Sequence, residues 1–132
     1  PEVVLIRALE PVGGLELMER RRGIRNPIQF CNGPGKLCQA MGITKAQYGW
    51  DLCGSDLYLA EGRPMGVDHI MVSPRINIDY AGECGNYLWR YFIKNNPYVS
   101  KVAKRYRTQQ QPYQREDVSS SSGLDAERER FA

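Results

Sequence analysis

The order of apolar and polar residues in the first 23 positions predicts a strand followed by a helix. Val3–Ala8 is an almost unbroken aliphatic run, which is typical of a strand that is buried on both faces. Pro11 and the glycine pair at 13–14 then interrupt regular structure. The segment Leu15–Arg22 favours a helix with apolar residues on one face, and Gly23 suits the position after its last turn.

A second helix is predicted between Asn32 and Gly42. Asn32 belongs to a residue type that caps helix starts. Pro34 is favoured in a first turn, because the N–H group that it lacks would have no partner there. Residues 36–41 are compatible with a continuing helix, and Gly42 is a typical end.

The later part of the chain predicts strands. Leu57–Leu59 and Ile70–Val72 are short apolar runs, and Trp89–Lys94 is aromatic and alternating. Arg75–Asp79 alternates polar and apolar residues, which is the period-two pattern of a half-buried strand. Helices early and strands late place the chain in the α+β class, and its 132 residues have room for one mixed domain.

The composition changes near residue 107. Residues 108–132 are polar and poor in apolar residues, so we predict a disordered tail after a folded body of residues 1–107. The body has 15 Lys and Arg against 10 Asp and Glu, a net charge of +5, and the tail has 3 against 5, a net charge of −2. A basic body suits a partner that carries phosphates, but many proteins that never bind nucleic acid have a similar charge.

Neither a metal site nor a membrane span is indicated. The cysteines form no Cys-x-x-Cys pair and His69 is the only histidine, so we expect no metal and no cofactor. No apolar run approaches the roughly 18 residues that a membrane helix requires. We expect reduced, partly buried thiols at Cys31, Cys38, Cys53 and Cys84.

The turn Gly33, Pro34, Gly35, Lys36 resembles a nucleotide-binding phosphate loop but lacks the Ser or Thr that would follow its lysine and bind magnesium. We therefore exclude a nucleoside triphosphatase. Two interpretations remain. Either free backbone N–H groups and Lys36 bind one phosphate at the helix start, or the turn only caps the helix.

Arg7 is a charged residue inside the apolar run. A guanidinium remains protonated, so its burial requires partners. Arg7 therefore either makes a structural ion pair or faces a polar cavity.

Two carboxylates and several aromatic residues could take part in chemistry or binding. Asp79 and Glu83 could act as acid or base, with a solvated or ion-paired carboxylate as the alternative. The aromatic residues could stack on bases, but their spacing is more typical of a buried sheet face. We expect them in the core: Tyr80, Tyr87, Trp89 and Tyr91.

Three stretches occur in a fixed order: VLIRALEP with GLELM at residues 4–18, NGPGKLCQAMGI at 32–43, and PRINIDYAGE at 74–83. Residues 89–93 and 96–100 continue the series. Together they resemble the carboxy-terminal half of the alkyladenine (3-methyladenine) DNA glycosylase family, from about residue 1 to 101. Each motif is modest alone, but the ordered set is specific.

This resemblance implies a single mixed domain around a curved antiparallel sheet, incomplete here at its amino-terminal side. It also implies base-excision repair. Such an enzyme flips an alkylated or deaminated purine out of double-stranded DNA, and an activated water then displaces the base. The expected protein is a monofunctional hydrolase that uses no metal or lysine adduct and is a monomer when complete.

The resemblance also assigns roles to individual residues. Arg7 matches the arginine that helps to hold the attacking water, and Ile76 matches the position whose main-chain carbonyl is a further ligand of that water. Asn77 and the Gly33–Lys36 turn match positions where the family approaches the DNA backbone.

The family's general-base glutamate, aromatic base pocket and tyrosine wedge lie outside the matched region, so we expect the 132-residue chain to be inactive alone. The resemblance implies a cytoplasmic, nucleoid-associated protein in a bacterium, or a nuclear or organellar one in a eukaryote. Two alternatives stay open: a non-catalytic nucleic-acid-binding module and a small α+β interaction domain.

Overall fold

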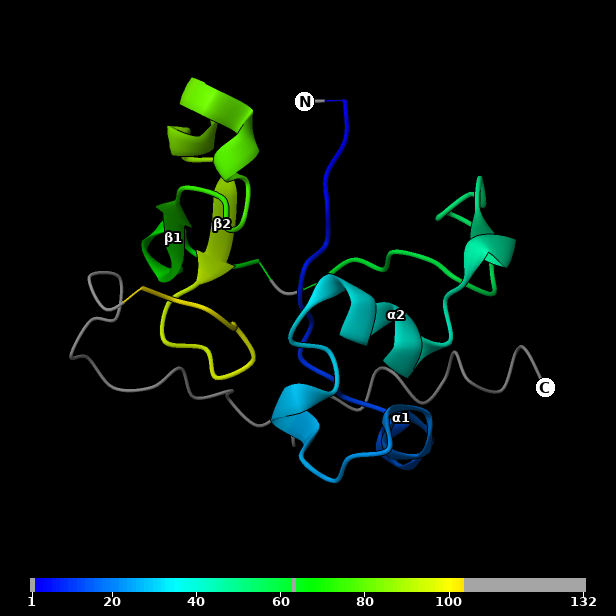
Figure 1. Ribbon diagram of the computed structural model, residues 1–132. Coiled ribbons are helices and arrows are strands. Elements are labelled where there is room, and N and C mark those ends of the chain that lie inside the picture. The colour runs from blue at the N-terminus through cyan, green and yellow to red at the C-terminus, as the bar shows by residue number, and fades with distance from the viewer. Residues whose placement is uncertain (1, 63, 104–132) are drawn as a thin grey trace.

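The computed structural model describes residues 2–62 and 64–103, and within them the chain is of the α+β class, as predicted (Figure 1). Two α-helices, α1 (Leu15–Arg22) and α2 (Pro34–Met41), come first. Two strands, β1 (Ile70–Ser73) and β2 (Arg90–Ile93), follow. Short 3-10 helices occupy the connections at Pro27–Gln29, Lys45–Gln47, Val67–His69 and Asp79–Asn86.

Both predicted α-helices are confirmed, and their ends follow from local chemistry. Helix α1 stops at Gly23, whose φ of 66° is left-handed and whose amide donates to the Glu19 carbonyl. Helix α2 starts with Pro34 in its first turn and stops at Gly42, where φ is 74°. The expected cap was wrong by one residue, because Gly33 holds the N-cap position and makes no side-chain capping bond.

The core of the described chain lies between the two helices. Its buried members come from the α1–α2 connection and from one face of α2: Phe30, Cys31, Leu37 and Ala40. Two arginines at the end of α1 reach across to the neighbouring backbone, since Arg21 Nη1 donates to the Ala40 carbonyl at 3.2 Å and Arg22 Nε to the Phe30 carbonyl at 3.1 Å. We call residues 15–43 the helix pair.

The two strands form an antiparallel sheet in which Ile70 pairs with Ile93 and Ser73 with Arg90. These strands confirm the predictions for Ile70–Val72 and Trp89–Lys94, with slightly different ends. Because the pairing is antiparallel, the last residue of β1 lies beside the first residue of β2. We call this end of the sheet, Ser73 with Arg90 and Tyr91, together with residues 74–89, the sheet end.

The predicted strand at Val3–Ala8 is wrong for the described chain. The segment is extended but has no strand partner there, and its apolar side chains are exposed, Val3 by 84%. Directly after it, the Leu9 amide donates to the Cys31 carbonyl at 3.2 Å. A run that is apolar on both faces needs cover on both faces, and no described element supplies it.

Two further predicted strands are also wrong. Leu57–Leu59 forms only a single bridge, between Tyr58 and Cys53. Arg75–Asp79 is a bend, because Pro74 has no N–H to donate and Asn77 has a left-handed φ of 57°. The alternation of polar and apolar residues therefore predicted a strand where the backbone turns.

The predicted tail at 108–132 and the end of the body at 107 lie outside the described residues. No helix within residues 2–62 and 64–103 is long and apolar enough to cross a membrane.

Candidate functional site

The sheet end gathers several of the residues that carry the predicted chemistry. Chain leaving β1 at Ser73 passes through Arg75 and Ile76, and chain entering β2 arrives through Trp89. The 3-10 helix Asp79–Asn86 lies beyond this end of the sheet, above β2 in Figure 1. Residues from both ends of this loop therefore come together where β1 ends and β2 begins.

Arg90 is the most tightly held cation at the sheet end. Its Nη2 donates to the Ser100 carbonyl at 2.8 Å and its Nη1 to the Lys101 carbonyl at 3.3 Å. The guanidinium also lies over the ring of Phe92, with 4.7 Å between Cζ and the ring centroid. The guanidinium therefore donates hydrogen bonds from its edge and packs its face against an aromatic ring.

The charge of Arg7, in the amino-terminal segment, acts on Arg90. Burial lowers the pKa of Arg90, and the positive charge of Arg7 lowers it further. Arg7 is half-buried, and within residues 2–62 and 64–103 no carboxylate lies within ion-pair distance of it. The ion-pair interpretation of Arg7 therefore finds no partner in this part of the chain, and its guanidinium remains able to donate to a further group.

Ile76 and Asn77 form the bend that follows β1. Ile76 is half-buried and Asn77 is exposed with a positive φ, which is uncommon for a residue other than glycine. Among the described residues, no donor reaches the Ile76 carbonyl oxygen. The bend thus presents an open main-chain acceptor beside the sheet end, although no contact joins Ile76 to Arg7 within the same residues.

Arg75 links the two halves of the loop at residues 74–89. Its Nη2 donates to the Cys84 carbonyl at 3.3 Å, and its Cζ lies 5.1 Å from the ring centroid of Trp89. Trp89 in turn meets Tyr87 edge to face, with centroids 5.0 Å apart. The Nε atom of Arg75 is buried without a hydrogen-bond partner.

Sequence reasoning gave no role to Arg90, and for Arg75 it raised only the same question as for Arg7, whether the side chain makes an ion pair or faces a polar cavity. The signal that singled out Arg7, a charge inside an apolar or aromatic run, also applies to Arg90 in Trp89–Lys94. For Arg75 the useful sign was weaker, a cation directly after Pro74.

The turn Gly33–Lys36 forms the exposed start of α2. Pro34 has no N–H, and no acceptor among the described residues meets the amides of Gly35 and Lys36. Lys36 Nζ donates to Asn32 Oδ1 at 2.9 Å. Two free amides and a cation at a helix start are compatible with an anion, but the role of this turn stays a prediction.

Ser100 connects that turn to the sheet end. Its hydroxyl donates to the Asn32 carbonyl at 2.7 Å, while its own carbonyl accepts from Arg90. A continuous series of hydrogen bonds thus runs from Lys36 through Asn32 and Ser100 to Arg90. These bonds connect the predicted DNA-backbone turn to the sheet end.

The remaining candidates are exposed. Asp79 and Glu83 lie in the 3-10 helix Asp79–Asn86 and are both exposed. The expectation that the aromatic residues fill a core is wrong for the described chain, because all of them are exposed: Tyr80, Tyr87, Trp89 and Tyr91. Within the described residues, no group of three or more His, Cys, Asp or Glu could hold a metal ion.

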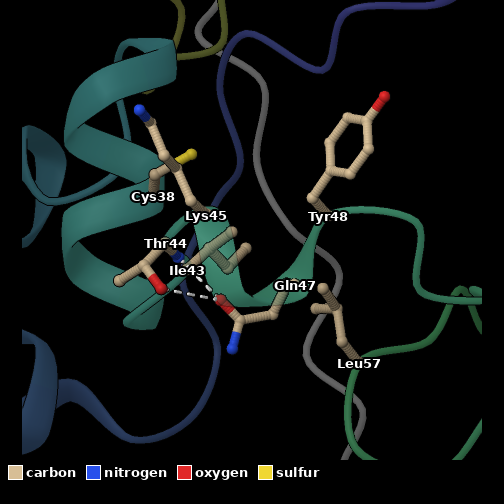
Figure 2. A pocket seen from close by; sticks show the side chains of 7 residues that line it. All are labelled: Cys38, Ile43, Thr44, Lys45, Gln47, Tyr48 and Leu57. Carbon is tan, nitrogen blue, oxygen red and sulfur yellow. Dashed lines mark hydrogen bonds between the residues drawn. The ribbon is translucent and has the colours of Figure 1, made fainter.

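A hollow of about 670 Å³ lies away from all these residues, between the end of α2 and Leu57 (Figure 2). Two of its polar side chains already serve a capping box: the Thr44 hydroxyl accepts from the Ala46 amide, and Gln47 Oε1 accepts from the Thr44 amide. Tyr48, at its rim, is 94% exposed. The hollow is lined mainly by apolar atoms and has no arrangement of acid, base and nucleophile.

Comparison with known proteins gives one consistent result. The family model described as methylpurine-DNA glycosylase matches residues 1–97. A Bacillus licheniformis protein named "Putative 3-methyladenine DNA glycosylase" is 52% identical over 101 residues, which cover 76% of this chain and 50% of that protein.

Two further relatives carry the same name. The Bacillus subtilis protein is 45% identical over 101 residues, covering 76% of this chain and 50% of the relative. The Methanocella arvoryzae protein is 48% identical over 105 residues, covering 78% and 52%. The chain spans about half the length of the curated relatives that it matches.

Proposed function

This chain belongs to the methylpurine-DNA glycosylase family, and we propose that the full-length protein is a monofunctional DNA glycosylase. By full-length protein we mean these residues together with the part of the family that they do not span. Its reaction is hydrolysis of the N-glycosidic bond of alkylated or deaminated purines in double-stranded DNA. The target base is flipped out first, because the bond cannot be reached inside the stack.

The observation that carries this proposal is the half-buried Arg7, which has no carboxylate partner in the described chain and whose charge acts on Arg90, at the end of the sheet where Ile76 follows β1. A guanidinium can only donate hydrogen bonds, and a main-chain carbonyl can only accept them. A water between Arg7 and Ile76 would therefore direct one lone pair to Arg7 and one proton to the carbonyl.

The general base completes this arrangement. This carboxylate takes the second proton of the water, and the second lone pair of the water is then free to attack the sugar carbon. The damaged purine leaves through an oxocarbenium-like transition state. Asp79 and Glu83 are exposed and are not assigned this role. We assign it to a glutamate outside these 132 residues, so the chain alone is expected to release no base.

DNA is held through its phosphates. We assign one phosphate to the start of α2, where Gly35 and Lys36 are exposed, and a further backbone contact to Asn77. Ser100 connects this turn to Arg90. On this proposal, the residues that contact the DNA backbone and the residues that hold the water therefore share one surface. We further propose that the full-length protein acts as a monomer in the compartment that holds the DNA.

Base release from duplex DNA that contains hypoxanthine or an alkylated adenine tests the proposal. The assay compares the 132-residue chain, the full-length protein, and the full-length protein carrying Arg7→Ala. Loss of a preorganised donor at the reacting water is expected to slow release about 100- to 1,000-fold. The matched control is Arg25→Ala, since the Arg25 side chain is 97% exposed and remote from the sheet end.

The possible outcomes distinguish the candidate functions. Release only by the full-length protein, slowed by Arg7→Ala and unchanged by Arg25→Ala, supports the glycosylase. Release by the 132-residue chain alone would show that a catalytic carboxylate lies within it. DNA binding without release by the full-length protein would instead support a non-catalytic nucleic-acid-binding module.

A further inference from the structure

The loop at residues 74–89 leaves the sheet at Ser73 and returns to it at Arg90. Ile76 lies near the start of this loop, in the bend that carries the positive φ of Asn77. A residue other than glycine keeps such a conformation when its surroundings hold it there. A contact within the molecule is therefore expected to hold the bend of this largely exposed loop.

Arg75 is the side chain that makes this contact. It comes directly before Ile76, and its guanidinium meets two groups from the returning half of the loop. The Cys84 carbonyl accepts from Nη2 at 3.3 Å, and the Trp89 ring lies under the guanidinium at 5.1 Å. Trp89 itself is fixed by its position next to β2 and by the edge of Tyr87.

The Nε atom of Arg75 has no hydrogen-bond partner in the described chain, so the Cys84 carbonyl and the Trp89 ring are the contacts from which we infer the position of the guanidinium. A buried donor without an acceptor is unfavourable, and an arginine free to turn would satisfy it. Arg75 leaves Nε unpaired in the described chain while keeping the Trp89 face and the Cys84 carbonyl. The guanidinium thus joins the beginning of the loop to its end.

We propose that Arg75 is a positioning residue that, through its contacts with Trp89 and the Cys84 carbonyl, fixes the direction of the Ile76 main-chain carbonyl toward the attacking water. The proposal rests on the proposed function, because it assigns Arg75 a role only if Ile76 holds that water. Arg75 and Ile76 are adjacent in the chain, so a shift of the Arg75 backbone would rotate the peptide between Ile76 and Asn77.

The test uses the full-length protein and separates rate from binding. We expect Arg75→Gln to lower the single-turnover rate of hypoxanthine release about 10- to 100-fold, since a displacement of about 1 Å at a reacting group has effects of that order. The dissociation constant for duplex DNA is expected to change less than about threefold, because no phosphate contact is removed. Arg75→Lys should restore part of the rate, since an ammonium still binds an aromatic face and a carbonyl.

Changes at Trp89 provide a second route to the same clamp. Trp89→Phe keeps an aromatic face and is expected to slow release less than Trp89→Leu, which removes it. In a double-mutant cycle, Arg75→Gln and Trp89→Leu should be non-additive, because either change alone releases the bend. The matched control is Arg22→Gln, in which the lost guanidinium also binds a main-chain carbonyl but lies in the helix pair.

The outcomes separate this proposal from the proposed function. An unchanged rate in Arg75→Gln, with the rate lost in Arg7→Ala, overturns the role of Arg75 and leaves the glycosylase intact. If Arg75→Gln and Arg22→Gln lower the rate, the DNA affinity and the melting temperature equally, Arg75 has only a structural role. That result also overturns its positioning role. Absence of release by the unmodified full-length protein removes both proposals.

Discussion

The helix pair and the sheet end differ in how completely they satisfy their own side chains. In the helix pair, Phe30 and Ala40 are buried and Arg22 has carbonyl and amide partners. At the sheet end, Trp89 and Tyr91 are exposed. Arg7 also has no carboxylate partner among the described residues. One region is closed by contacts near in sequence, and the other offers groups that still need partners.

This difference shows where structure and chemistry reside in the chain. A closed unit of two helices gains its stability from local contacts and provides a base on which neighbouring segments are anchored. Unpaired donors and exposed aromatic faces are unfavourable in isolation, and a ligand or another segment can satisfy them. The Ser100 bridge between Asn32 and Arg90 is the link through which the closed unit positions the open one.

Truncating a buried aromatic residue should produce the largest loss of stability and sharpen the comparison. Phe30→Ala removes a ring that is 1% exposed, and we expect the free energy of unfolding to fall by about 3–5 kcal/mol. Tyr91→Ala, at a ring that is 68% exposed, should cost less than about 1 kcal/mol. Urea titration of the 132-residue chain, followed by helical circular dichroism, measures both. Equal losses would mean that the sheet end is packed as firmly as the helix pair.

Gly42→Ala should produce the next largest effect, and Gly23→Ala is its matched control. Both glycines end a helix with a positive φ, at a strain for alanine of about 1–2 kcal/mol. A Cβ at Gly42 would also lie 2.9 Å from Arg21 Cζ, whereas one at Gly23 meets nothing within 4 Å. Moving Arg21 breaks its bond to the Ala40 carbonyl, which adds about 0.5–1.5 kcal/mol.

The Arg21 contribution can be isolated with the same urea titration. In an Arg21→Ala background, Gly42→Ala should cost no more than Gly23→Ala, because no guanidinium remains to be displaced. If the difference between the two glycines persists there, the contact with Arg21 is not its cause.

Lys36→Ala should break the simple division between a structural and a functional region. Lys36 belongs to the helix pair but is exposed, so we expect unfolding to change by less than about 0.5 kcal/mol. In the full-length protein, loss of one phosphate contact should lower the slope of log affinity against log salt by about 1. Lys45→Ala, at another exposed lysine beside a capping box, is the control. Equal slopes for both variants would remove Lys36 from the DNA interface.

Local chemistry explains which elements the sequence could predict. The helices were predicted because their signals, Pro34 in a first turn and the glycines that end both helices, Gly23 and Gly42, act over a few residues. The false strand at Arg75–Asp79 had the right alternation, but Pro74 and the left-handed Asn77 turn the backbone. Val3–Ala8 has a strand composition, yet pairing depends on a partner that no nearby residue specifies.

The candidate site was predictable only in part for the same reason. Arg7 stood out because a charge within an apolar run demands an explanation. Its neighbour Arg90 is brought to it by tertiary structure, and Arg75 depends on a ring at Trp89 that the loop must return to reach. Pairings between distant segments are decided by the folded chain and have no local signature.

The smallest expected effect is an alkaline loss of stability that originates in the helix pair. Burial raises the pKa of the Cys31 thiol, and the positive charge of Arg22 opposes this rise. From about pH 8.5 upward the thiol ionises in the unfolded chain, while the folded chain still holds its proton. The unfolded state then binds fewer protons, so stability falls with rising pH until the folded thiol also ionises.

Urea titrations of the 132-residue chain between pH 7 and 10 measure this decline. Cys31→Ala should reduce its slope, since the buried thiol is gone, although the variant is less stable at every pH. Cys53→Ser, at an exposed cysteine, should keep the slope of the unmodified chain. A decline that is identical in all three proteins would assign it to other groups. A decline confined to proteins with Cys31 would show that the core of the helix pair keeps this thiol away from water.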